Sequence, residues 1–75
     1  FIKQLTNDFS ADSLVLSFIE QTKELITYQE YTLALENLLK SLLEKYISIP
    51  RDTLAIIDVV DDPYIKRLQA SLWGV

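Results

Sequence analysis

The sequence predicts an all-α fold, a compact bundle of four to five short helices around a central long helix at about residues 28–46. Apolar residues recur at steps of three and four along the chain, and no segment alternates with the period of two that indicates a strand. The single glycine and the two prolines lie at the ends of these periodic segments, where helices tolerate them. A chain of 75 residues is expected to form one helical domain, residues 1–75.

An amphipathic stretch predicts the first helix, and a polar cap predicts the start of the second. Residues 1–8 form a short amphipathic stretch. Ser10 or Asp12 can cap the helix that follows, because each offers a side-chain oxygen to free backbone N–H groups. We expect this second helix to run to about Ile26. Its apolar members are Leu14, Leu16, Phe18, Ile19, Leu25 and Ile26.

The third helix has the clearest local signal at its start. The run Thr27-Tyr28-Gln29-Glu30 is predicted to form a capping box, in which the hydroxyl and the carboxylate each satisfy a free N–H. The helix is expected to continue to about Tyr46 at the centre of the bundle, because its apolar stripe is wide enough to contact several neighbours. The stripe, all of it assigned to the core, consists of Tyr31, Leu35, Leu38, Leu39, Leu42, Leu43 and Tyr46.

Prolines mark the two remaining helix starts. Pro50 suits the first position of a fourth helix, and Asp62 followed by Pro63 indicates the cap and first turn of a last helix. Trp73 is expected to anchor this last helix, with Gly74 as its C-terminal cap. The fourth helix is expected to face the core with Leu54, Ile57 and Val60, and one face of the last helix carries Tyr64, Ile65, Leu68 and Leu72.

Composition argues against several kinds of active site. The chain has no cysteine and no histidine, which removes the thiolate nucleophile, the usual general base and the commonest metal ligands. Carboxylates cluster at Asp58, Asp61 and Asp62, but the spacing is not that of an EF-hand, and Asp61 and Asp62 are expected to serve as helix caps. We therefore expect no enzyme activity, no cofactor and no metal site.

The formal charge of −4 arises from 11 acidic and 7 basic residues. It argues against a nucleic-acid partner and against docking on an anionic membrane, and no apolar run approaches the roughly 18 residues of a membrane span. An acidic chain suits a basic protein partner, although mild acidity that serves only solubility is the simpler alternative. The lack of cysteine fits the reducing cytoplasm, where we expect the protein.

Two overlapping LxxLL matches, Leu35–Leu39 and Leu39–Leu43, lie in the third helix. Such a motif can place its leucines in a partner's groove. The stripe of a buried helix produces the same matches, and we interpret these leucines as core residues.

Two acidic surfaces, each with a tyrosine, are the candidate binding sites. The first consists of Glu20, Glu24, Tyr28 and Glu30, and the second of Asp58, Asp61, Asp62 and Tyr64. The carboxylates would contact cationic residues of a partner, and the tyrosine would supply buried contact area.

The middle of the chain, roughly residues 14 to 60, resembles the small bacterial MafI-type immunity proteins. The resemblance is carried by Phe18-Ile19-Glu20, by Glu30-Tyr31 leading into Leu33-Ala34-Leu35-Glu36-Asn37-Leu38-Leu39, and by Ile47-Ser48-Ile49-Pro50, with Leu42, Leu43, Tyr46, Leu54 and Ile57. The chain departs from that family in the Thr27-Tyr28-Gln29 turn, where glycine is usual, and at Leu43-Glu44-Lys45. The resemblance implies a cytosolic antitoxin that binds a cognate secreted toxin, often a nuclease.

Our first hypothesis is therefore an immunity protein that neutralises a toxin by masking its functional surface. The alternative is a structural or adaptor bundle that associates with proteins or with itself, for example as a homodimer, through leucine-rich helix faces.

Overall fold

The computed structural model describes residues 1–75 and contains five α-helices and one 3₁₀ helix. These elements are α1 (Ile2–Asp8), α2 (Ser13–Thr27), α3 (Tyr31–Glu44), α4 (Arg51–Ala55), the 3₁₀ helix η1 (Ile56–Val59) and α5 (Pro63–Trp73). No strand is present, so the predicted all-α fold is confirmed.

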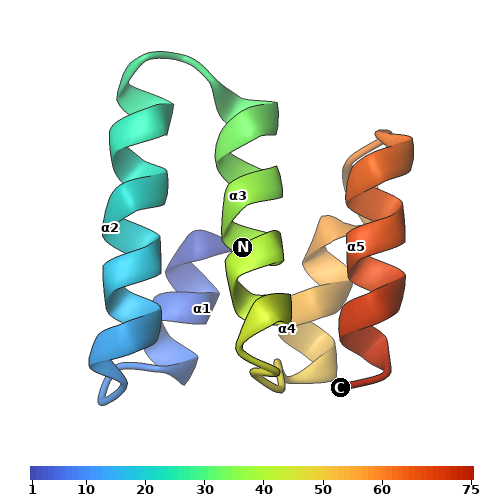
Figure 1. Ribbon diagram of the computed structural model, residues 1–75, viewed down its shortest axis with the longest axis horizontal. Coiled ribbons are helices and arrows are strands. Elements are labelled where there is room, and N and C mark those ends of the chain that lie inside the picture. Colours follow the sequence, from blue (N-terminus) through green and yellow to red (C-terminus); the bar gives the residue numbers. More distant parts are fainter.

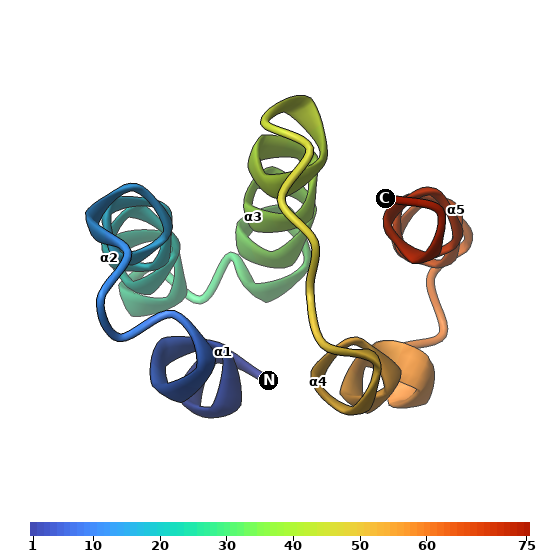
Figure 2. The same ribbon diagram turned by 90° about the horizontal axis from the view of Figure 1, so that it is seen from below.

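The helices form two layers (Figures 1 and 2). α2, α3 and α5 form one layer with α3 in the middle, and α1 and α4 cover one side of it. α3 packs against both α2 and α5, which is the central position that the sequence predicts. Its extent was predicted too long, because the helix spans residues 31–44 rather than 28–46. α2, with 15 residues, is longer than α3, with 14.

Aspartates cap the N-termini of two helices, α2 and α5. Asp12 caps α2 and Asp62 caps α5, and each carboxylate accepts hydrogen bonds of 3.0 to 3.2 Å from the backbone N–H groups two and three residues later. Asp12 rather than Ser10 is therefore the cap of α2. Pro50 occupies the N-cap position of α4, one residue earlier than predicted.

Both long helices of the N-terminal half end in the same backbone motif without a glycine. Gln29, with φ 61°, follows α2, and Tyr46, with φ 53°, follows α3. The next N–H group, that of Glu30 or Ile47, donates to the carbonyl five residues earlier, at 3.1 and 3.0 Å. These are Schellman motifs, which satisfy the last carbonyls of a helix and turn the chain away from its axis.

The predicted capping box at residues 27–30 is wrong. Thr27 is the last residue of α2, and its hydroxyl donates to the carbonyl of Lys23 at 3.0 Å. Glu30 stands at the N-cap of α3 but makes no capping hydrogen bond. The α2 helix and its Schellman turn use the backbone that a capping box would need, so the Thr27 side chain points back along α2.

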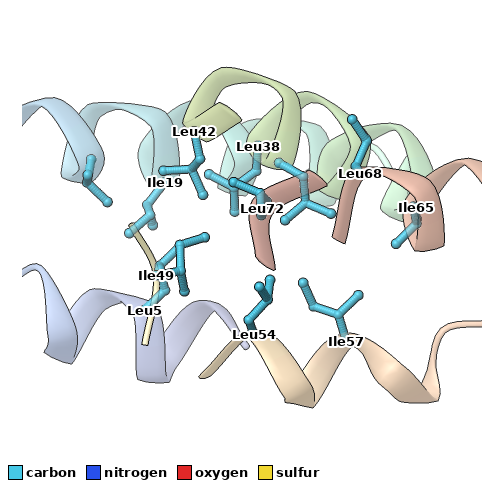
Figure 3. Close-up of a cluster of buried hydrophobic side chains, with 12 residues drawn as sticks. Leu5, Ile19, Leu38, Leu42, Ile49, Leu54, Ile57, Ile65, Leu68 and Leu72 are labelled. Carbon is cyan, nitrogen blue, oxygen red and sulfur yellow. The ribbon is translucent and has the colours of Figure 1, made fainter. Parts of the chain in front are cut away.

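One apolar core fills the space between the two layers (Figure 3). Side chains from α1, α4 and η1 meet side chains from α2, α3 and α5 there. The core interpretation of the LxxLL matches is confirmed for Leu38, Leu39 and Leu42, which are buried. The twelve core residues are Leu5, Val15, Ile19, Leu38, Leu39, Leu42, Ile49, Leu54, Ile57, Ile65, Leu68 and Leu72.

Two tyrosines assigned to the core lie outside it. Tyr31 is 62% exposed and Tyr46 is 82% exposed, while Tyr64, a candidate binding residue, is 43% exposed. Tyr46 leaves the helical periodicity because it adopts the left-handed conformation beyond the end of α3. Tyr31 and Tyr64 lie in the first turns of their helices, at the rim of the bundle.

The α4–η1 segment is held in place by polar contacts as well as by the core. The buried amide of Gln69 in α5 donates to the carbonyl of Leu54 at 3.1 Å and to the carboxylate of Asp58 at 2.6 Å. The Arg51 guanidinium lies over the ring of Trp73, 5.9 Å from its centroid. Trp73 thus connects the end of α5 to the start of α4, as expected of an anchor.

Candidate protein-binding surface

The first candidate surface follows one exposed stripe of α2. Glu20, Glu24 and Tyr28 are spaced by four residues, and all three are exposed. Residues four apart on a helix are neighbours on its surface, so the two carboxylates and the ring form a continuous row. Glu20 makes an ion pair with Lys23 at 3.6 Å, whereas Glu24 has no partner within the protein.

The turn after α2 extends this row. Tyr28 is 77% exposed because the Schellman motif turns the chain away from the helix axis at this point. Glu30, two residues later, is exposed and makes no capping bond. Glu20, Glu24 and Tyr28 thus share one exposed side of α2, and Glu30 lies in the turn that leads into α3.

The second candidate surface is largely occupied by structural contacts. Asp62 caps α5 with its carboxylate, and Asp58 accepts the hydrogen bond from Gln69. Asp61 and the half-exposed ring of Tyr64 remain available, beside Val59, which is 87% exposed. Of the three predicted carboxylates, only Asp61 is therefore without a role in the fold.

The two surfaces lie at the same end of the bundle but do not merge. In Figure 1 the α2–α3 turn and the segment leading into α5 both lie at the upper end, with the N-terminal half of α3 between them. A single partner would have to cross α3 to reach both. The first surface, whose acidic side chains have no structural duty beyond one exposed ion pair, is the better candidate.

A pocket that the sequence analysis did not anticipate lies between α2 and α3. Its volume is about 320 Å³, and its apolar floor is surrounded by polar side chains of both helices. No single segment of the sequence contains this pattern, because the polar residues come from separate helices. The lining residues are Phe18, Gln21, Thr22, Leu25, Asn37, Leu38, Lys40, Ser41 and Glu44.

A second, apolar groove of about 420 Å³ lies where α1 meets α2 and α3. Tyr31, which was expected in the core, stands at this groove together with Ile26 and Leu35. Tyr31 belongs to the apolar stripe of α3, which is the sequence feature that points to this groove. The prediction that the whole stripe is buried was wrong. The other lining residues are Phe1, Ile2, Lys3, Thr22 and Ala34.

No group of three or more Asp, Glu, His or Cys side chains lies close enough together to hold a metal ion. None of the helices combines the length and apolar character needed to cross a membrane.

Comparisons with known proteins found no match for this chain. No family model, no curated protein and no solved structure matches it.

Proposed function

We propose that this protein is an immunity protein, which binds a cognate bacterial toxin through the exposed face of α2 and masks the toxin's functional surface. The partner is a protein with a basic surface, such as the active site of a nuclease, which must hold phosphate. The protein performs no reaction itself and is expected to act in the cytoplasm, where an antitoxin must protect the producing cell.

The observation that carries the proposal is the row formed by Glu20, Glu24 and Tyr28. The Tyr28 ring is 77% exposed beside two carboxylates whose only contact within the protein is the exposed ion pair of Glu20 with Lys23, so all three side chains are available to a partner. Tyrosine combines a large apolar body with a polar tip and is enriched in the hot spots of interfaces.

The net charge of −4 supports the same kind of partner. Opposite charges on the two proteins accelerate the diffusional encounter and fix the orientation in which they dock. A standard interface covers about 800 Å² on each protein, which is about one-sixth of the accessible surface of 4872 Å². An interface of this size would include the exposed face of α2 and residues that flank it.

The resemblance of residues 14 to 60 to the MafI-type immunity proteins led us to this class of partner. It supports the proposal through the helical segments around α2 and α3, and it suggests where the toxin is encoded. Immunity genes lie beside their toxin genes, so the product of the neighbouring reading frame is the first partner to examine.

Growth rescue tests the proposal. The product of the neighbouring reading frame is expressed in a susceptible bacterium with and without this protein, and the pair is then purified through a tag on this protein. We expect the chain to restore growth and to retain the toxin. Growth arrest in the presence of the folded chain, together with no retained toxin, would contradict the proposal.

A pair of charge-matched variants makes the test specific for the surface. Glu20→Gln with Glu24→Gln removes two carboxylates from the α2 row, and Asp52→Asn with Asp61→Asn removes two exposed carboxylates elsewhere. Rescue should fall for the first pair and persist for the second. Loss of rescue only in the second pair would transfer the binding site to the second surface.

A second candidate function, an adaptor bundle that associates with itself, is favoured by the apolar groove at Ile26, Tyr31 and Leu35. It predicts a dimer whose stability does not depend on salt, because apolar contacts are not screened. Sedimentation equilibrium of the isolated chain at low and high salt separates the two functions. A monomer under both conditions excludes the adaptor.

A further inference from the structure

The pocket between α2 and α3 adjoins the acidic row on α2. Gln21 and Leu25 line the pocket, and Glu24 and Tyr28 follow each of them by three residues. Residues three apart are neighbours on a helix surface, so Glu24 and Tyr28 lie beside the pocket without lining it. A partner seated on the row therefore has the pocket next to it.

The walls of the pocket carry hydrogen-bonding groups that the fold leaves unused. The side chains of Gln21, Asn37, Ser41 and Glu44 line the space, and none of them makes a side-chain hydrogen bond or an ion pair within the protein. Together they offer amide, hydroxyl and carboxylate oxygens to a donor. Below them lies an apolar floor of Phe18, Leu25 and Leu38.

The charges at the pocket decide between a cationic and an anionic occupant. Glu44 and Lys40 both line it and are four residues apart on α3, yet they make no ion pair. The charges that line the pocket therefore balance, and Glu24, three residues after Gln21 on α2, adds a second carboxylate beside the pocket but outside its lining. Lys40 is exposed, so its long side chain can hold the ammonium group in solvent when a cation enters.

We propose that this pocket receives an arginine side chain of the partner and is the anchor point of the interface. The methylene stem would pack on the apolar floor, while the planar guanidinium, with five N–H donors, would bond the Glu44 carboxylate and the neighbouring amide and hydroxyl oxygens. The inference rests on the proposed function, because it names the group of the toxin that this surface recognises. A volume of about 320 Å³ is sufficient for one such side chain.

An NMR titration of the complete chain with short peptides tests the pocket without the toxin. The probe is acetyl-Ala-Arg-Ala-amide, and the matched peptides carry glutamate or leucine in place of the arginine. We expect the arginine peptide to bind with a dissociation constant of about 1–10 mM, since few atoms are engaged. The amide signals that shift should be those of Gln21, Asn37, Ser41 and Glu44. No localised shift with the arginine peptide, or equal shifts with the glutamate peptide, would overturn the inference.

Two substitutions in α3 are expected to affect the affinity for the arginine peptide differently. Glu44→Gln should weaken binding of the arginine peptide by about fivefold, because the bond to a charged acceptor is lost. Lys40→Gln should leave it unchanged or strengthen it, because a repelling charge is removed. The opposite order of the two variants would assign the pocket to an anionic group and contradict the proposal. Both substitutions are at the surface, and circular dichroism confirms that the helices remain.

The two proposals fail in different ways. If the peptide binds in the pocket but the toxin is neither retained nor neutralised, the immunity function is wrong and the arginine pocket stands. If growth is rescued but the arginine peptide produces no localised shift, the function stands and the pocket is wrong.

Discussion

The hydroxyl of Thr53 donates a hydrogen bond to the carboxylate of Asp8, which joins α4 to α1. Thr53 is buried, and the same Asp8 carboxylate also accepts a bond from Gln4 at 3.1 Å. The bond connects the first helix to the C-terminal half of the chain. It therefore helps to close the layer of α1 and α4 over the core.

Thr53→Val removes this hydroxyl while keeping the shape of the side chain. We expect the free energy of unfolding to fall by about 1–2 kcal/mol, since a bond to a charged acceptor is lost. Urea denaturation measures the change. Thr27→Val is the matched control, because the Thr27 hydroxyl bonds only within α2 at an exposed position. Equal effects of the two variants would show that the Thr53–Asp8 bond contributes nothing specific.

Substitutions of two neighbouring aspartates, Asp61 and Asp62, test the N-terminal cap of α5. Asp62→Ala should cost about 1 kcal/mol of stability, because the N–H groups of Tyr64 and Ile65 lose their acceptor. Asp61→Ala, one residue earlier, removes an exposed carboxylate with no such bond and should change stability by less than about 0.5 kcal/mol. Thermal unfolding of both variants gives the comparison, and a larger loss for Asp61→Ala would refute the assigned cap.

Tyr46→Gly should stabilise the protein. Tyr46 adopts φ 53°, which is costly for a residue with a Cβ and free of strain for glycine, and its exposed ring contributes little burial. The expected gain is about 1 kcal/mol. Lys45→Gly, at a neighbouring position with φ −95°, should instead destabilise the fold. A loss of stability in Tyr46→Gly would mean that the ring makes contacts worth more than the strain.

The leucines of α3 are expected to contribute very different amounts to the stability of the fold. Leu42→Ala should cost about 2–5 kcal/mol, because this side chain is fully buried at the centre of the core. A protein of this size has little more stability than that, so the variant should be largely unfolded at room temperature. Leu33→Ala, at an exposed position of the same helix, should melt near the wild-type temperature. Similar melting of the two variants would contradict the core position of the LxxLL leucines.

The starts of α2 and α5 and the leucine and isoleucine core were predictable from the sequence, because they depend on local signals, whereas the predicted start of α3 was wrong. Asp12 and Asp62 are strong caps just before apolar periodic segments, and the period of Leu38 and Leu42 identifies the buried face. Helix ends were less predictable. The usual signal is glycine, and here Gln29 and Tyr46 adopt the left-handed conformation without it.

The candidate site was predictable only in part. The row of Glu20, Glu24 and Tyr28 follows from helical spacing alone, once α2 is recognised. Which carboxylates are free does not follow, since the bond that occupies Asp58 comes from Gln69 in the next helix. The pocket was not predictable, because it depends on how α2 and α3 align in space.

The affinity for the toxin, measured by calorimetry at two salt concentrations, tests the account most directly. Removing the Glu20 and Glu24 carboxylates should weaken binding by about tenfold or more and reduce its dependence on salt, because close interfacial charge pairs are lost. The Asp52→Asn, Asp61→Asn control should bind within about twofold of the wild type. Unchanged affinity after loss of the α2 carboxylates would contradict the central claim that this face of α2 recognises a cationic protein.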